Sequence, residues 1–161
     1  MKPLRWIAIL AVCAAGLMAA GTAAHAEDKA TKDVRAAAGQ FYAARDALFK
    51  GDVAPMAGVW SHKDDVTYMG PAGGFRVGWA QVLADWQAQA ALKLGGTIES
   101  RDMRITVGRE LAVISNIEAG QNVVDGKPQT VTIRATSMFR KEGGKWKMIG
   151  HHTDLLPYLQ K

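Results

Sequence analysis

Cysteine is nearly absent from this sequence. The single one, Cys13, lies in an apolar stretch near the N-terminus. One cysteine cannot form an internal disulfide, and zinc sites built from cysteine need several thiolates. If the N-terminal segment is removed, the remaining chain has no thiol for catalysis or cross-linking.

Two common catalytic motifs are also missing. The glycine-rich stretch 70–74 is not followed by the lysine and helix start that would cradle a phosphate. The chain has no Gly-x-Ser-x-Gly turn of the kind that presents a nucleophilic serine. The sequence therefore argues against a phosphate-loop enzyme and against a serine hydrolase of that type.

A strong basic surface is lacking as well. The whole chain has 20 Lys and Arg against 15 Asp and Glu. Without residues 1–26, which carry Lys2 and Arg5, the formal charge is 18 − 15 = +3. The basic residues are scattered, apart from a cluster over 140–147 at an expected hairpin tip, so we predict no nucleic-acid partner.

The N-terminus has the pattern of a secretory signal peptide. Lys2 and Arg5 precede an apolar stretch over 6–20, and Ala24-His25-Ala26 forms a small-x-small cleavage site. A retained membrane anchor is the alternative, which the Ala- and Gly-rich stretch and the cleavage site disfavour. We expect a periplasmic or secreted protein with no membrane association after cleavage. Its mature part, 27–161, has 161 − 26 = 135 residues and forms one domain.

The first half of the mature chain has helical patterns. Apolar residues recur at three- and four-residue spacing from Asp33 to Phe49, which predicts an amphipathic helix. Gly51 would end it, and Asp52 would cap a short second helix over 56–59. The spacing after Gly78 predicts another long helix, built on Trp79, Val82, Leu83, Trp86 and Ala90.

The second half has strand patterns. A short strand is expected over 65–69, and apolar and polar residues alternate after Thr97. Turn signals at Gly108-Arg109, Asp125-Gly126 and Glu142-Gly143-Gly144 divide this half into hairpins. The sequence therefore predicts a long antiparallel meander.

Helices followed by hairpins are typical of the α+β class, with the helices on one face of the sheet. We expect a cone-shaped barrel, in which a curved antiparallel sheet packs on the N-terminal helices and leaves a cavity between the layers. Large rings supply apolar area with a polar edge. We expect four of them to bind a ligand there, although a role in the core alone is the alternative: Trp60, Tyr68, Trp79 and Trp86.

Two segments carry a family resemblance. Residues 60–71 read Trp-Ser-His-Lys-Asp-Asp-Val-Thr-Tyr-Met-Gly-Pro, and residues 144–154 read Gly-Lys-Trp-Lys-Met-Ile-Gly-His-His-Thr-Asp. With the order of helices and hairpins, over about residues 33 to 156, the chain resembles the SnoaL-like branch of the nuclear transport factor 2 superfamily. The resemblance implies a cone-shaped α+β barrel, often dimeric through the outer face of its sheet, with a pocket at the wide end.

Members of this superfamily differ in activity. They include ketosteroid isomerase, polyketide cyclases, epoxide hydrolases and dehydratases, together with members that only bind or assemble, so the fold does not give the function. The isomerase pattern, an acidic base facing a tyrosine and a protonated acid, does not map residue by residue onto this chain.

Arg134 is the first candidate for a catalytic role, because it interrupts an otherwise apolar strand. A three-residue loop in the next hairpin would set Arg134 opposite His152, and a four-residue loop would set it opposite His151, at about 5 Å between Cβ atoms. Only one of these histidines can share a face with Arg134. Guanidinium and imidazole could together hold a carboxylate or enolate oxygen. The alternative is a structural pair capped by Glu118 or a terminal acid.

His62, Asp64 and Asp65 form the second candidate group. In an extended segment, Asp64 could orient the His62 imidazole as a general base, and either His62 or Asp65 could move a proton. Ordinary loop chemistry is the alternative. A metal held by His62, Asp64, His151 and Asp154 is disfavoured because their spacing fits no common site, so we predict no metal and no cofactor.

Two functions follow from these patterns. The first is an exported pocket protein for a small, mostly apolar compound with an oxygen function, with isomerase, cyclase or hydrolase chemistry if it is an enzyme. The second is a non-catalytic ligand-binding or dimeric assembly module. Both are compatible with a homodimer, since the outer face of the meander would otherwise expose Val, Ile and Met.

Overall fold

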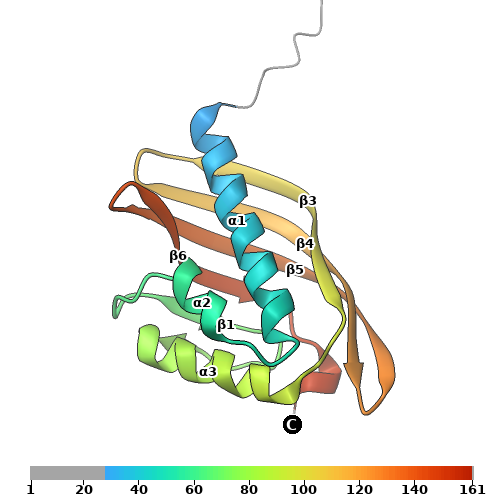
Figure 1. The fold of residues 1–161 in the computed structure, drawn as a ribbon. Coiled ribbons are helices and arrows are strands. Elements are labelled where there is room, and N and C mark those ends of the chain that lie inside the picture. Colours follow the sequence, from blue (N-terminus) through green and yellow to red (C-terminus); the bar gives the residue numbers. More distant parts are fainter. Residues whose placement is uncertain (1–27, 161) are drawn as a thin grey trace, which may run out of the picture.

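Helices cover one face of a curved sheet in the computed structural model, which describes residues 28–160 (Figure 1). The predicted signal peptide and its cleavage site lie outside these residues. The helices are α1 (Lys29–Leu48), α2 (Ala54–Val59), α3 (Trp79–Leu92) and a short 3₁₀ helix, η1 (Pro157–Leu159). Within residues 28–160, no helix is both long enough and apolar enough to cross a membrane.

The long helix α1 begins one turn earlier than predicted, at Lys29. The Asp28 side chain accepts a hydrogen bond of 2.8 Å from the Thr31 amide and so caps the first turn. Gly51, with a φ of 98°, follows the end of the helix in a conformation that favours glycine. One face of α1 is buried along its whole length, and it carries Val34, Ala37, Ala38, Phe41, Ala44, Arg45 and Leu48.

The other helices follow the predicted signals. The Asp52 carboxylate accepts a hydrogen bond of 3.0 Å from the Ala54 amide at the start of α2. Helix α3 buries Val82, Trp86 and Ala90. It ends where Lys93 adopts a left-handed conformation, just before Gly95 and Gly96.

The sheet has six strands in the order β2-β1-β6-β5-β4-β3. The predicted antiparallel meander is formed by the last four in the chain, whereas β1 runs parallel to β6 because a long crossover separates them. Their bounds are β1 (Thr67–Met69), β2 (Arg76–Val77), β3 (Thr97–Val107), β4 (Leu111–Val124), β5 (Lys127–Glu142) and β6 (Lys145–Thr153).

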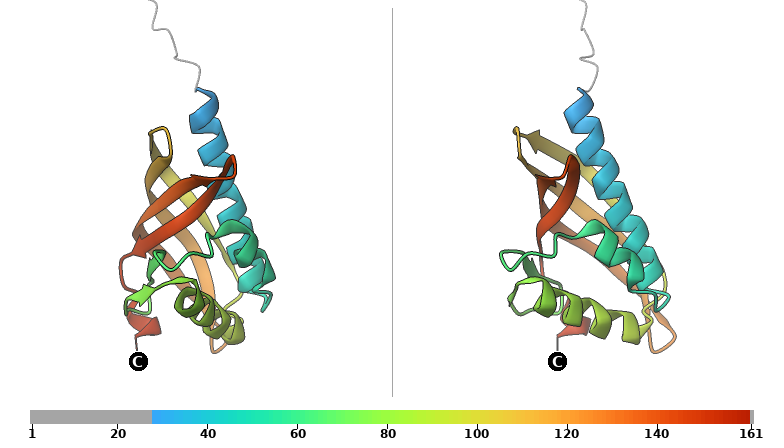
Figure 2. Two further views of the ribbon diagram at one scale, coloured as in Figure 1. Left: turned by 90° about the vertical axis from the view of Figure 1, so that its left-hand side faces the viewer. Right: turned by 60° about the vertical axis from the view of Figure 1, so that its left-hand side comes forward.

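The sheet curves around α1 without closing, so that β2 and β3 are its two edges (Figure 2). Its concave face packs against the helices. On β4 this face carries Ala112, Ile114, Asn116 and Glu118, all of which are buried. Two of these four are polar, so the core contains a polar cluster at the centre of the sheet.

The register of the β5–β6 hairpin is set by two local features. Gly143 and Gly144 form a two-residue turn, since Glu142 pairs with Lys145. A bulge then shifts the register between Met138 and Phe139. Together they set each residue in the later part of β6 opposite a β5 residue nearer the turn than a three- or four-residue loop would.

Candidate functional site

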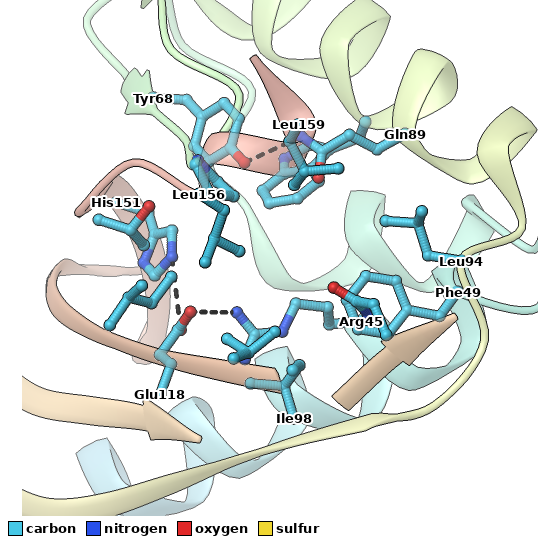
Figure 3. A pocket seen from close by; sticks show the side chains of 16 residues that line it. Arg45, Phe49, Tyr68, Gln89, Leu94, Ile98, Glu118, His151, Leu156 and Leu159 are labelled. Atoms are coloured by element: carbon cyan, nitrogen blue, oxygen red, sulfur yellow. Dashed lines mark hydrogen bonds and ion pairs between the residues drawn. The ribbon is translucent and has the colours of Figure 1, made fainter. Parts of the chain in front are cut away.

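A cavity lies between α1, α3 and the concave face of the sheet, and its lining is drawn in Figure 3. Leu156 and Leu159, next to and within η1, cover it from the C-terminal side. The space open to the centre of a water molecule is about 30 Å³, which is room for about two or three waters. The lining includes Arg45, Tyr68, Trp86, Gln89, Glu118 and His151.

A buried ion pair forms the polar floor of this cavity. Arg45 of α1 donates from Nη1 to Glu118 Oε2 on β4 at 2.6 Å, and both side chains are less than a tenth exposed. Burial would raise the pKa of Glu118, but the Arg45 guanidinium and the hydrogen bonds to the carboxylate outweigh it and hold the pKa below its ordinary value. Glu118 is therefore an anion in the core.

Tyr42 completes the hydrogen bonding of this carboxylate. Its hydroxyl donates to Glu118 Oε1 at 3.2 Å and accepts from Asn116 Nδ2 at 2.8 Å. Burial, together with the nearby Glu118 charge, raises the pKa of Tyr42 to about 12. The hydroxyl consequently keeps its proton and remains a donor to Glu118.

His151 of β6 lies on the other side of Glu118, with Nε2 at 3.6 Å from Oε1. Burial lowers the pKa of His151 to about 4, although the Glu118 charge opposes the shift. The imidazole is thus neutral at pH 7. Ser137 Oγ lies 2.9 Å from Nδ1, and a hydroxyl donating to Nδ1 leaves the Nε2–H directed at the carboxylate. That tautomer is the one that the Glu118 charge favours.

The unpaired polar atoms of the lining are hydrogen-bond donors. Within residues 28–160, Arg45 Nε and Nη2, Trp86 Nε1 and Thr153 Oγ1 are buried without a protein partner, and all three residues line the cavity. Buried donors are usually paired, because an unpaired one costs about 1 to 3 kcal/mol. The cavity therefore presents several donors and is suited to a group rich in acceptors.

A second polar group lies at the opposite end of the lining from Arg45 (Figure 3). Gln89 of α3 donates from Nε2 to the Tyr68 hydroxyl at 2.9 Å and to Asp85 Oδ2 at 2.9 Å. Asp85 is itself held by Arg76 Nε at 3.0 Å. Burial raises the pKa of Tyr68 further above its ordinary value, so its hydroxyl keeps its proton.

Two of the four aromatics expected in the cavity are there. Tyr68 and Trp86 line it, with ring centroids 4.4 Å apart. Trp60 is buried behind them in the core, where its ring meets the edge of Tyr68 at 6.3 Å. Trp79 lies at the surface end of α3 and stacks on His62 at 4.5 Å, away from the cavity.

The predicted geometry of Arg134 is wrong. The two-residue turn and the bulge set Arg134 opposite Asp154, while Thr136 pairs with His152. Arg134 donates from Nε and Nη2 to the Asp154 carboxylate and is 82% exposed on the outer face. This contact lowers the pKa of Asp154 to about 2. Arg134 therefore does not lie beside the cavity.

Of the two histidines at the end of β6, His151 faces the cavity and His152 is exposed on the other face. His62 also lies outside, where Nε2 is 2.8 Å from the Ala57 carbonyl. Asp65 is exposed and paired with Arg140 at 2.6 Å. The predicted candidates are thus spread over three places, and His151 alone among the five reaches the cavity.

Arg45 and Gln89 were not singled out from the sequence, and Glu118 was considered only as a possible cap of a structural pair that contains Arg134. Arg45 stands four residues after Phe41 and three before Leu48, and this helical spacing was a signal for the buried face of α1. On β4, three of the four residues Leu111, Val113, Ser115 and Ile117 are apolar, yet this set lies on the outer face of the sheet. The alternate residues of β4, which include Glu118, face the core.

Residues 28–160 bring no three His, Cys, Asp or Glu side chains into a group that could hold a metal ion. The polar cluster instead contains the Arg45 cation, the Glu118 anion and the neutral imidazole of His151. These groups can bind an oxygen function and hold a proton near it.

Comparison with known proteins adds the following. Residues 34–156 match the family described as SnoaL-like domain. No curated protein matches the sequence.

Solved structures share the fold. A putative dehydratase of the NTF2-like family from Streptomyces avermitilis is 20% identical, with 81% of this chain and 99% of that chain covered and a TM-score of 0.70. A putative calcium/calmodulin-dependent protein kinase type II association domain from Thiobacillus denitrificans is 27% identical, with 76% and 94% covered and a TM-score of 0.63. A similar association domain from Xanthomonas campestris is 23% identical, with 81% and 90% covered and a TM-score of 0.62. These matches are to proteins with different descriptions, so they support the fold and not one activity.

Proposed function

The chain belongs to the SnoaL-like domain family, and on that premise we propose that its cavity binds a small organic acid, with the carboxylate on Arg45. The observation that carries this proposal is the half-paired state of the buried guanidinium, whose Nε and Nη2 have no partner within residues 28–160. Arginine presents its donors in a fixed fork that matches a carboxylate. A ligand carboxylate on these two atoms would pair them.

The rest of the lining supports an acid with an apolar body. Phe49, Leu94, Ile98 and Ile133 supply apolar walls around the polar floor. The cavity holds only about two or three waters with Leu156 and Leu159 in place. Entry of a longer acid would therefore move these two leucines outward.

The charge of the site bears on its chemistry. Arg45 and Glu118 neutralise each other, so a bound carboxylate would add a net negative charge beside the neutral His151. A nearby negative charge raises the pKa of a histidine. Binding of the acid would therefore raise the pKa of His151, and its protonated form would be the acid for proton transfer to the ligand if the protein is an enzyme.

The test is calorimetric titration of linear carboxylic acids, from propanoate to heptanoate, into the chain 27–161. The double variant Arg45→Gln/Glu118→Gln removes both charges without leaving one unpaired. We expect it to weaken binding at least about tenfold, because charge-assisted hydrogen bonds are lost.

A matched control removes the ion pair on the other face of the sheet. The double variant Arg134→Gln/Asp154→Asn should bind the same acids as the wild-type chain does. Absence of binding to the wild-type chain, or equal binding to the Arg45→Gln/Glu118→Gln variant, would contradict the proposed function.

We also propose a homodimer through the outer face of the sheet, the role favoured by the assembly hypothesis. Leu111 is 55% exposed and Val113 is 40% exposed on β4, and Val113 lies beside Met138 in the register. Light scattering of the chain 27–161 should give a dimer, and Val113→Lys should shift it toward monomer. A monomeric wild-type chain would exclude this proposal.

Export is the remaining part of the proposal, and it rests on the N-terminal sequence. Expression of the full chain in a bacterium, followed by fractionation and mass spectrometry, should recover a protein that begins at Glu27 in the periplasm or the medium. Recovery of the uncleaved chain in the cytoplasm would contradict it.

A further inference from the structure

The hydrogen bonding of Tyr68 fixes the direction in which its proton points. The Asp85 carboxylate can only accept hydrogen bonds, so the group of Gln89 that faces it is the NH₂. The same nitrogen lies 2.9 Å from the Tyr68 oxygen. An amide nitrogen does not accept, and therefore the tyrosine oxygen is the acceptor in this contact.

The Tyr68 hydroxyl has one hydrogen, and the Gln89 contact cannot use it. Within residues 28–160, no acceptor is paired with this O–H. The side chain is 2% exposed and lines the cavity. The Tyr68 hydroxyl can thus donate its proton to a group inside the cavity, as one more donor beside those of Arg45, Trp86 and Thr153.

The Tyr68 hydroxyl is held from two sides, by Gln89 with the Asp85–Arg76 ion pair behind it and by Gly70. Arg76 Nε lies 3.0 Å from Asp85 Oδ1 and so keeps the carboxylate beside Gln89. Gly70 closes the site from the loop side, where a Cβ at this position would lie 2.1 Å from the Tyr68 oxygen. Any side chain at residue 70 would displace the hydroxyl.

From this arrangement we propose that Tyr68 is a specificity-determining residue and that the cavity selects acids carrying a second acceptor, a keto oxygen, at the end remote from the carboxylate. The inference rests on the proposed function, because it needs the carboxylate on Arg45. Figure 3 draws Tyr68 and Gln89 at one end of the lining and Arg45 with Glu118 at the other, with Leu156 between them. The ligand spans the two ends with an apolar chain.

The test compares pairs of linear acids of five, six and seven carbons. Each pair consists of the unsubstituted acid and the acid with a keto group next to its terminal methyl, so that one length can match the span. We expect the wild-type chain to bind the keto acid of the best length about three- to tenfold more tightly than its partner, as one neutral hydrogen bond provides.

Variants assign the preference to Tyr68. Tyr68→Phe should bring the ratio of the two affinities to about one while the unsubstituted acid binds as before. Tyr158→Phe is the matched control; it removes a hydroxyl that donates to Asn122 and should leave the ratio unchanged.

The outcomes separate the two proposals. If acids bind through Arg45 but the ratio in the wild-type chain is one at all three lengths, Tyr68 does not select the ligand and this inference is wrong. A ratio that persists in Tyr68→Phe also overturns it. If no acid binds, or if binding is unchanged in Arg45→Gln/Glu118→Gln, the proposed function fails and this inference falls with it.

Discussion

Two arginine–carboxylate pairs of similar length lie on opposite faces of the same sheet. Arg45 and Glu118 are 2.6 Å apart on the concave side, and Arg134 and Asp154 are 2.8 Å apart on the outer side. The outer arginine uses Nε and Nη2 on its partner, whereas the same atoms of the buried arginine are unpaired. Pairing is therefore complete on the exposed face of the sheet and incomplete beside the cavity.

The two ion pairs also differ in what they contribute to the stability of the fold. A surface ion pair is worth about 0 to 1 kcal/mol, since water and salt compete with it. A buried charge is costly unless it is paired and hydrogen-bonded. A core that leaves two guanidinium nitrogens unpaired gives up stability, and the acid that we propose would pair them.

The largest expected effect is on the buried pair. Arg45→Gln leaves the Glu118 charge in the core without its cation and should lower the free energy of unfolding by about 3 to 5 kcal/mol. Urea denaturation measures this loss. The double variant Arg45→Gln/Glu118→Gln should recover much of it, because no charge is then left alone. Equal losses in the single and the double variant would show that the Glu118 charge is not the cause.

The next largest effect is a pH dependence of the free energy of unfolding, which we expect from His151. Its folded-state pKa, about 4, lies below the value of 6.5 for an exposed histidine, so the unfolded chain binds the proton more tightly. The stabilisation is fully present above pH 6.5 and is lost as the pH falls toward 4. The free energy of unfolding should fall by about 3 kcal/mol in this window.

The matched variants isolate this histidine. His151→Gln should remove the dependence between pH 6.5 and 4, and His152→Gln, on the exposed face, should keep it. Glu118 titrates below its ordinary value and so acts at lower pH. A decline that remains in His151→Gln would assign the dependence to another group.

A smaller effect is expected at Tyr42. Tyr42→Phe removes the donor to Glu118 Oε1 and leaves Asn116 Nδ2 without its acceptor, at a cost of about 1 to 3 kcal/mol. Tyr158 is half-buried and makes a single hydrogen bond, to Asn122, so Tyr158→Phe should cost less. Denaturation curves that coincide for the two variants would contradict the ranking.

The smallest effect is expected on the outer face. Arg134→Gln should leave the free energy of unfolding close to that of the wild-type chain, because its partner is exposed and can be hydrated. The same measurement in high salt should reduce the difference further. A loss as large as that of Arg45→Gln would remove the contrast between the two pairs.

Much of the fold followed from local patterns. Helical spacing gave α1 and α3 within a few residues, and alternation with turn signals gave the meander, because both depend on short-range geometry. The parallel pairing of β1 with β6 depends on contacts far apart in the chain, and no local signal predicts it.

The site was predicted less well, for two physical reasons. The register of a hairpin depends on the turn length and on bulges, and the two-residue turn with the bulge near Met138 set Arg134 opposite Asp154 and not opposite either histidine. Polar residues in the core also look like surface residues in a sequence. Glu118 and Arg45 could be placed only once the curved sheet set them against each other. The prediction that Tyr68 and Trp86 line the cavity was possible because large side chains gather in their segments. His151 was one of two alternatives, together with His152, for the histidine that faces the cavity.

The central claim is that the free donors of Arg45 hold the carboxylate of a small acid. The most direct measurement follows the arginine Nε–H signals by NMR while hexanoate is added to the chain 27–161. One signal, absent from the Arg45→Gln/Glu118→Gln variant, should shift with the same dissociation constant as calorimetry gives, while the Arg134 signal stays in place. A bound acid that leaves the Arg45 signal unmoved would contradict the account.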